Sequence, residues 1–177
     1  MQDADLIVTG KKMLLLDSKN TCLDHAAVAV NGDEIIAVGD LKKIVKQYKA
    51  KKTIEAGDSL IMPGFVNCHT HAAMTCFRGI ADDLVLMDWL NNYIFPAEAK
   101  NVNKELAYWG SLLGAAEMIK SGTTTFCDMY IFEDETARAA KEAGIRCLVG
   151  EVLFDFPSPN FKTQEEGVAY TKMLIEK

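Results

Sequence analysis

Two of the three histidines in the chain, His69 and His71, are separated by a single residue. They follow an apolar run that predicts a β-strand, and side chains two positions apart on a strand point to the same side. Two imidazoles that converge on one point supply half of the ligands of a tetrahedral zinc site or of a related divalent-metal site. The preceding Cys68 points the other way, so we exclude it as a ligand.

A His-x-His pair is also compatible with two ordinary histidines of the core or the surface. The metal interpretation is favoured because the pair follows the strand-like run Pro-Gly-Phe-Val at residues 63–66. The carboxyl ends of parallel strands are where barrel active sites are assembled. The third histidine, His25, lies near a turn, and we expect a surface or structural role for it.

The first 59 residues are predicted to form a β-rich segment. Short apolar runs alternate with turn residues, and Asn31-Gly32 between two such runs is a strong hairpin signal. A helix is expected after Asp40, which is a suitable N-cap. The expected strands cover residues 4–9, 12–16, 26–30, 34–38 and 52–56, and the expected helix covers residues 41–49.

From residue 60 onward, strands and helices alternate, which is typical of a parallel α/β layer with right-handed crossovers. Gly144 suits the residue that follows the end of a helix. The expected strands cover residues 60–68, 123–128 and 145–154, and the expected helices cover 84–93, 103–121, 133–143 and 163–177. The predicted organisation is a β-rich segment at 1–59 followed by an α/β segment at 60–177.

The α/β segment reaches residue 177 inside a predicted helix, after about three strand–helix units. Three parallel strands alone leave an exposed sheet edge, which natural proteins normally cover or pair. We therefore expect this chain to be the front part of a longer protein. A hypothesis from a different class is a truncated, non-catalytic interaction module that self-associates through this edge.

Composition excludes several classes of protein. The 177 residues carry 19 Lys+Arg against 25 Asp+Glu, a net charge of −6, and 49% of them are hydrophobic, so the chain is neither disordered nor built to bind nucleic acid. The lysine-rich stretch at 42–52 is interpreted as a solvated helix face. No apolar run approaches the ~18 residues that span a bilayer, and the acidic N-terminus lacks the positive region of a signal peptide. Five cysteines without a C-x-x-C pair predict reduced thiols in the cytoplasm.

Several runs around the histidine pair resemble the amidohydrolase superfamily and, within it, the 5-methylthioadenosine/S-adenosylhomocysteine deaminases. The run LIMPGFVNCHTHAAM at residues 60–74 resembles the first barrel strand of the superfamily. The runs FRGIADD (77–83), MDWL (87–90), IFPAE (94–98) and EMIKSGTTTFCD (117–128) are similar to the deaminases. The resemblance implies an α/β metal-dependent-hydrolase fold: a small β-sandwich segment followed by a (β/α)8 TIM barrel, of which about three units are present.

The resemblance also implies a metal site. In such enzymes the first-strand histidine pair binds the metal with two later histidines and an aspartate, and the glutamate of an H-x-x-E motif is the proton shuttle. Only His69 and His71 carry over, because His71 is the last histidine of the chain, so the proton shuttle is expected beyond residue 177. The expected cofactor is one divalent metal, Zn first, with Fe, Mn and Ni as alternatives because two imidazoles suit all of them.

The implied reaction is the hydrolytic deamination of an adenosine thioether to the inosine derivative and ammonia, with Glu98 accepting hydrogen bonds from the ribose hydroxyls. The structural alternative for Glu98 is that an acid just after Pro96, in the first turn of a helix, complements the helix dipole. Trp89 either packs in the core or lines an apolar pocket for the purine or the thioether. Arg78 is expected to orient a loop or to pair with Asp82 or Asp83.

Asp128 ends a predicted strand, and helix capping explains it as well as a site role does, so it is left out of the predicted site. The alternative within the enzyme class is a related aminohydrolase or chlorohydrolase of another heterocycle. The expected partner is a small-molecule nucleoside, with no nucleic acid and no membrane, and a homo-oligomer is a further expectation.

Overall fold

The computed structural model describes residues 1–176 and contains two compact units, residues 1–63 and the residues from Gly64 onward. The division lies four residues later than the predicted boundary after residue 59. The reason is that Leu60 and Ile61 pair with Lys12 and Met13 in the first unit, so the expected single strand over 60–68 is wrong.

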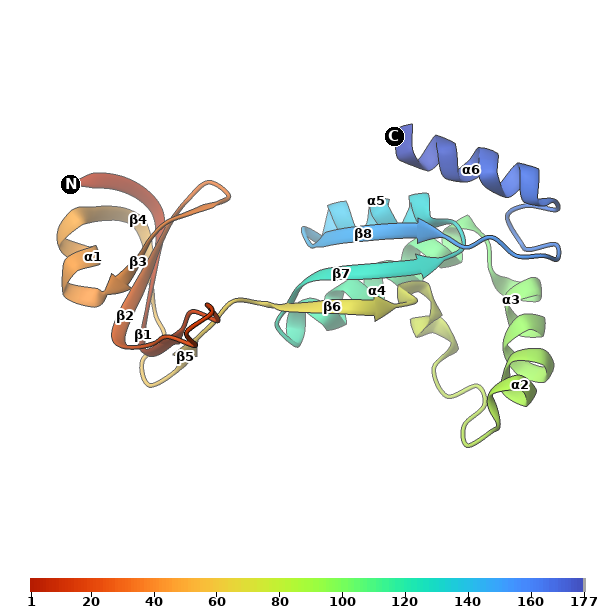
Figure 1. The fold of residues 1–177 in the computed structure, drawn as a ribbon, viewed down its shortest axis with the longest axis horizontal. Helices are drawn as coiled ribbons and strands as arrows, with labels where there is room; N and C mark the ends of the chain where they lie inside the picture. Colours follow the sequence, from red (N-terminus) through yellow and green to blue (C-terminus); the bar gives the residue numbers. More distant parts are fainter. Residues whose placement is uncertain (177) are drawn as a thin grey trace. The chain divides into compact units, whose positions relative to one another are not determined.

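The first unit is a five-stranded sheet in the order β3-β2-β1-β4, with the short β5 also paired to β1 (Figure 1). Strand β1 is antiparallel to β2 and parallel to β4 and β5. Ile44 packs from the single helix onto alanines of β2, whose small side chains allow the helix to approach. The elements are β1 (Gln2–Leu14), β2 (Cys22–Asn31), β3 (Glu34–Asp40), α1 (Leu41–Gln47), β4 (Tyr48–Glu55) and β5 (Leu60–Ile61).

Two predictions made from local sequence in this unit are confirmed, and one is wrong. Asp40 accepts a hydrogen bond from the Lys43 amide at 3.1 Å as the N-cap of α1, and β2 and β3 form the predicted hairpin. The expected break between two strands at Gly10 does not occur. A Cβ at Gly10 would lie 2.9 Å from the Ile61 side chain, so glycine here permits the close approach of β5 and is not a turn.

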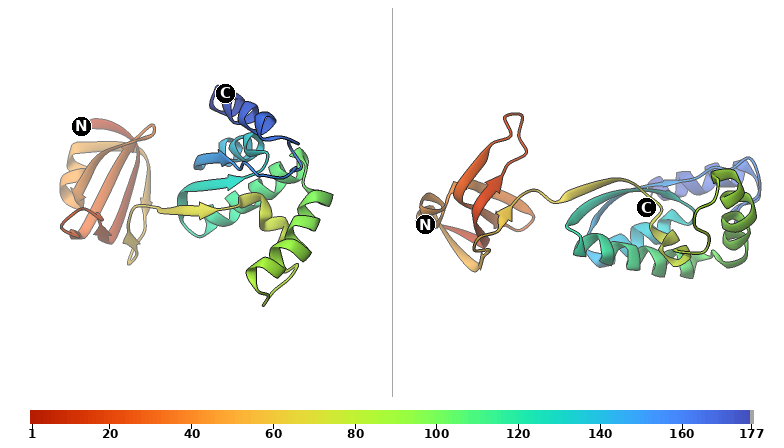
Figure 2. Two further views of the ribbon diagram at one scale, coloured as in Figure 1. Left: turned by 45° about the vertical axis from the view of Figure 1, so that its right-hand side comes forward. Right: turned by 90° about the horizontal axis from the view of Figure 1, so that it is seen from below.

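The second unit is a parallel three-stranded sheet, β6-β7-β8, with α4 and α5 packed against one face (Figure 1 and Figure 2). This α/β arrangement agrees with the predicted alternation. Its strands are β6 (Phe65–Thr70), β7 (Thr123–Tyr130) and β8 (Arg146–Glu151). Its helical segments are the 3-10 helix η1 (Ala72–Phe77), α2 (Leu86–Trp89), the π-helix η2 (Leu90–Ile94), α3 (Phe95–Asn101), α4 (Lys104–Lys120), α5 (Glu133–Ala143) and α6 (Gln164–Glu176).

The helices of the second unit follow their sequence signals closely where those signals are local. Asn103 caps α4, and α5 covers the predicted residues and ends at Gly144 with φ +73°. Strand β8 is shorter than predicted, because its last paired residue, Glu151, lies opposite Tyr130 at the end of β7. Within residues 1–176, no helix is both long enough and apolar enough to span a membrane.

Candidate functional site

The two histidines of the His-x-His motif lie together at the carboxyl end of β6. Their ring centroids are 5.0 Å apart and the ring planes are inclined at 78°. His69 is exposed and His71 is half-buried. The predicted juxtaposition is therefore present, with His69 in β6 and His71 one residue beyond its end.

The ring of His71 is held from the neighbouring strand. Its Nδ1 lies 2.5 Å from the carbonyl oxygen of Met129, and a carbonyl oxygen can only accept, so Nδ1 carries the proton. The lone pair of Nε2 then remains available. A histidine whose one nitrogen donates to a carbonyl while the other is free is the usual arrangement of a metal ligand.

Asp128, which was not part of the predicted site, is hydrogen-bonded next to this pair. Its side chain is 2% exposed, and Oδ2 accepts a hydrogen bond from the Ala72 amide at 2.8 Å. Within residues 1–176, Oδ1 is buried without a hydrogen-bond partner. Burial raises the pKa of Asp128 to about 6, against the lowering effects of the Ala72 amide and the two histidines. Asp128 is thus bonded to the backbone that directly follows His71.

The residues present fit a divalent metal as a pair of imidazole ligands. Both rings belong to one strand end, and one of them has its tautomer set by a carbonyl. The described part of the chain contains no group of three or more His, Cys, Asp and Glu side chains placed to hold a metal. These residues therefore supply a pair of ligands and not a complete coordination shell.

Glu98 lies in α3, but α3 does not begin at a free helix end. The backbone is helical from Leu86 through the π-helix to Asn101, and the Phe95 amide already donates to the Leu90 carbonyl. Pro96 has no N–H to donate, and the π-helix just before it changes the hydrogen-bond pattern at the point where that donor is missing. Glu98 is in the first turn of α3, as the helix-dipole interpretation expects, but this turn continues a helical run and is not a free helix N-terminus.

The carboxyl group of Glu98 is bound by a tyrosine of the sheet. Tyr130, the last residue of β7, donates its hydroxyl hydrogen to Oε1 of Glu98 at 2.7 Å, and the two residues are 6% and 8% exposed. Burial raises the pKa of Glu98, and the hydrogen bond from Tyr130 and the nearby imidazole of His71 oppose that rise. Burial also raises the pKa of Tyr130, so the hydroxyl remains a donor.

One cavity brings three of the four predicted site residues together. It has a volume of about 220 Å³, and His71, Trp89 and Glu98 all line it. We call it the Glu98 cavity; its other lining residues are Met74, Leu90, Ile94, Phe95, Met129, Tyr130, Val152 and Phe154. His69 is beside His71 but is not part of this lining. A cavity with apolar walls, one imidazole and one carboxyl group is suited to a flat, partly polar small molecule.

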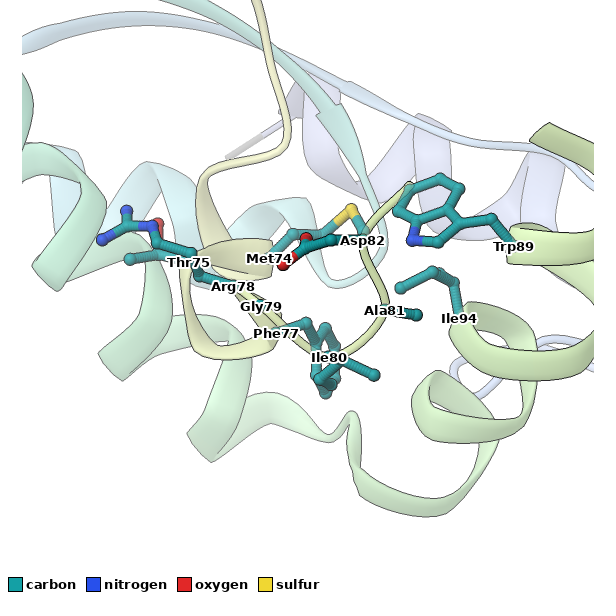
Figure 3. Close-up of a pocket in the computed structure, with 10 residues that line it drawn as sticks. All are labelled: Met74, Thr75, Phe77, Arg78, Gly79, Ile80, Ala81, Asp82, Trp89 and Ile94. Atoms are coloured by element: carbon teal, nitrogen blue, oxygen red, sulfur yellow. The ribbon is translucent and has the colours of Figure 1, made fainter. Parts of the chain in front are cut away.

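Trp89 also lines a second cavity, of about 310 Å³, between η1, the 78–82 loop and the helical run. Figure 3 shows the Trp89 indole at one end of this cavity and the Arg78 guanidinium pointing away from it. Trp89 belongs to none of the described buried core clusters. Arg78 donates to both carboxylate oxygens of Glu117, at 3.1 and 2.6 Å, so its expected pairing with Asp82 or Asp83 is wrong.

Two buried carboxyl groups beneath the end of β7 were not anticipated. Glu151 accepts hydrogen bonds from the Phe132 and Glu133 amides at 3.3 and 2.9 Å, so a residue of β8 caps the start of α5. Glu133 is fully buried, and burial together with the charges of Asp128 and Glu151 raises its pKa to about 9. Burial raises the pKa of Glu151 to about 7.

A sequence signal existed for Asp128 and Tyr130 but not for Glu133 and Glu151. Phe126, Asp128 and Tyr130 alternate along β7 and are all buried, so the period of two places both polar residues on the core side. From sequence, Glu133 is one of three acids in the first turn of a helix. Only the tertiary contact with Glu151 distinguishes it from the other two.

Comparison with known proteins adds three findings. Residues 60–175 match the model of the Amidohydrolase family. The chain is 62% identical over 175 residues to "5-methylthioadenosine/S-adenosylhomocysteine deaminase 1" of Syntrophus aciditrophicus, and 51% identical over 174 residues to the similarly named protein of Syntrophobacter fumaroxidans. These alignments cover 99% and 98% of the chain but 40% of each relative, so the chain spans about two fifths of the length of the relatives it matches.

Among solved structures, an adenosine deaminase from Xanthomonas campestris with bound Zn superposes with a TM-score of 0.96 at 35% identity. The match covers 99% of this chain and 40% of that one.

Proposed function

The chain belongs to the amidohydrolase family, and from that premise we propose that the protein containing it is a metal-dependent deaminase of an adenosine thioether such as 5-methylthioadenosine or S-adenosylhomocysteine. One observation carries the proposal. The Glu98 cavity joins an imidazole of the His-x-His motif, a carboxyl group and an aromatic ring in a single space. The names of the relatives that the chain resembles support the same substrate class.

The fold of this proposal is a (β/α)8 barrel preceded by a small β-sandwich. The parallel strands β6, β7 and β8 with their helices would form its first three units, and the sheet at residues 1–63 would form part of the sandwich. The active sites of such barrels lie at the carboxyl ends of the strands. His69 lies near the end of β6, His71 follows its last residue, and Tyr130 ends β7, so all three are at that end of the sheet.

His69 and His71 would hold the metal, which we propose to be Zn, with Fe, Mn and Ni as alternatives. When bound, such a metal activates a water molecule for attack on an electrophilic ring carbon. The chain contributes the orientation of His71 through Met129 and the bond between Asp128 and the Ala72 amide. The further histidines and the H-x-x-E motif that the family resemblance implies have no counterpart in residues 1–177.

Glu98 would bind the ribose and Trp89 would contact the thioether end of the substrate. The Glu98 carboxyl group has one oxygen engaged by Tyr130, and the other has no hydrogen-bond partner in the described chain. A ribose hydroxyl is a suitable donor to that oxygen. The apolar walls formed by Trp89, Leu90 and Phe154 match the sulfur-bearing tail in polarity.

The test is a substrate comparison with the Zn-loaded protein as it is made in its source cell. We expect ammonia release from 5-methylthioadenosine and S-adenosylhomocysteine, and little from guanine or a triazine, which have no ribose. Glu98→Gln should lower kcat/KM for the nucleosides far more than for any ring without ribose. The matched control is Glu142→Gln, in an exposed glutamate of α5. Turnover of a free heterocycle but of neither nucleoside would instead favour a related aminohydrolase or chlorohydrolase.

The five cysteines are all unpaired in the described chain, which suits the cytoplasmic location that we propose.

A further inference from the structure

We propose that Tyr130 is a positioning residue for nucleoside recognition, which holds the Glu98 carboxyl group so that one oxygen faces the ribose. This inference rests on the proposed role of Glu98 as the ribose ligand. It adds a residue of β7, 32 positions from Glu98 in the sequence, whose hydroxyl has no other hydrogen-bond partner in the described chain.

The two carboxyl oxygens of Glu98 have different environments. Oε1 of Glu98 accepts from the Tyr130 hydroxyl at 2.7 Å. Oε2 has no partner within residues 1–176, yet it is not among the enclosed unpartnered atoms, and Glu98 lines the cavity. One oxygen is therefore anchored in the protein and the other is open to a ligand.

The Tyr130 side chain that binds Glu98 is held in place by its neighbours. Tyr130 belongs to the buried cluster that contains Phe77, Val102 and Ile131, so its ring is fixed by packing. Its ring centroid is 6.1 Å from that of His71. Tyr130 is thus close to the histidine that we assign to the metal site and is hydrogen-bonded to the carboxyl group that we assign to the ribose site.

Loss of the Tyr130 hydroxyl should affect Glu98 and not the fold. Phenylalanine at position 130 would keep the packing but leave Oε1 of Glu98 buried without a donor, which is costly for a carboxyl group. The carboxyl group would then turn toward whatever donor is available, including solvent in the cavity. Recognition of the ribose should weaken while the metal pair and the fold remain intact.

The experiment compares Tyr130→Phe, Glu98→Gln and the double variant in the Zn-loaded protein as it is made in its source cell. The readout is kcat/KM for 5-methylthioadenosine divided by kcat/KM for its analogue without ribose hydroxyls. Tyr130→Phe should lower this ratio by about tenfold, mainly through KM, as expected for a lost hydrogen bond to a carboxylate. If Tyr130 acts through Glu98, the double variant should be no worse than Glu98→Gln.

The control is Tyr108→Phe, which removes another tyrosine hydroxyl that donates to a glutamate, Glu142, away from the cavity. This variant should leave the ratio unchanged. Incorporation of para-aminophenylalanine at position 130 keeps a donor at the same place and should restore the ratio, which separates positioning from packing. Zn content and the unfolding temperature are measured for every variant, so that a misfolded protein is recognised.

The outcomes separate the two proposals. If Glu98→Gln lowers the ratio and Tyr130→Phe either leaves it unchanged or adds its full effect in the double variant, the role of Tyr130 is overturned while Glu98 remains the ribose ligand. If Glu98→Gln itself leaves the ratio unchanged, the proposed ribose site fails first.

Discussion

The carbonyl oxygen of Met129 lies 2.5 Å from Nδ1 of His71, so the backbone of β7 sets the orientation of a side chain at the end of β6. The residues on either side of Met129 act on the same region. Asp128 accepts from the Ala72 amide, and Tyr130 donates to Glu98. Three consecutive residues at one strand end thus connect the histidine motif with the carboxyl group of the cavity.

The alternation of side chains along β7 explains how Asp128, Met129 and Tyr130 contact different groups. Asp128 and Tyr130 are buried on the same side of β7, while Met129 between them is exposed and its carbonyl oxygen accepts from His71. A one-residue slip of β7 against β6 would reverse these directions. The register of the parallel sheet is therefore a requirement of the site.

The histidine pair is tested by metal affinity. His69→Asn and His71→Asn should each weaken Zn binding by at least about 100-fold, because the loss of a ligand costs more than the 10- to 100-fold typical of a lost outer partner. His25→Asn is the control, since His25 is exposed in β2 and its positive φ of 47° is tolerated by Asn. Competition with a chromophoric chelator measures the affinities. Equal affinities for all three variants would exclude the pair as ligands.

Substitution of Trp89 distinguishes a ligand-binding role of this side chain from a role in core packing. Trp89→Phe should raise KM for the thioether nucleoside by about tenfold, since an aromatic side chain in a ligand pocket contributes on the order of 1–2 kcal/mol. The unfolding temperature should change little, because Trp89 lies outside the described core clusters. Trp109→Phe, in an exposed tryptophan of α4, is the control. A large loss of stability with an unchanged KM would assign Trp89 to the core.

Sequence reasoning succeeded where the determining interactions are local. Helix α5 matches its predicted bounds because 11 residues rich in glutamate and alanine precede a glycine that adopts φ +73°. The closeness of the His69 and His71 rings could also be predicted, because it follows from the two-residue period of an extended chain. The capping of α1 by Asp40 is a third case, since donor and acceptor are three residues apart.

Sequence reasoning failed where the decisive partner is distant. Ile61 belongs to the first unit because it pairs with Met13, and no local feature of LIMPGFV reveals this. The partner of Arg78 is Glu117, 39 residues away, and not either of the nearby aspartates. Glu98 was anticipated through family resemblance, but its anchor Tyr130 was not, because the bond joins a helix to a strand across the fold.

Glu133 predicts a pH dependence of stability. Its folded pKa, about 9, is above the unfolded value of 4.5, so the folded state holds this proton more tightly. The resulting stabilisation is fully present below pH 4.5 and is lost as the pH rises through about 9. Glutamine imitates the protonated acid, so Glu133→Gln should raise the free energy of unfolding by roughly 1–3 kcal/mol at pH 8, and by more at pH 9 than at pH 6.

Urea unfolding of both proteins between pH 6 and pH 9 measures this difference. Glu135→Gln, in a glutamate of the same helix that pairs with Arg138, controls for the loss of one negative charge from α5. If the stability of Glu133→Gln follows the same pH curve as the unsubstituted protein, Glu133 does not hold a proton in the folded state.

Gly110 tests the packing that supports the histidine motif. A Cβ at this position of α4 would lie 2.5 Å from the carbonyl oxygen of Ala73 and 3.0 Å from its Cα, so the backbone of η1 would have to move. Gly110→Ala should therefore destabilise the protein by roughly 1–3 kcal/mol, despite the better helix propensity of alanine. Since η1 begins directly after His71, Zn affinity should fall as well.

The control is Gly39→Ala. At Gly39 no atom lies within 4 Å of the added Cβ, so this variant should change stability by less than about 0.5 kcal/mol and leave Zn binding unchanged. Thermal unfolding and Zn titration of the two variants measure both effects, and a Gly110→Ala protein as stable as Gly39→Ala would show that α4 does not approach η1 this closely.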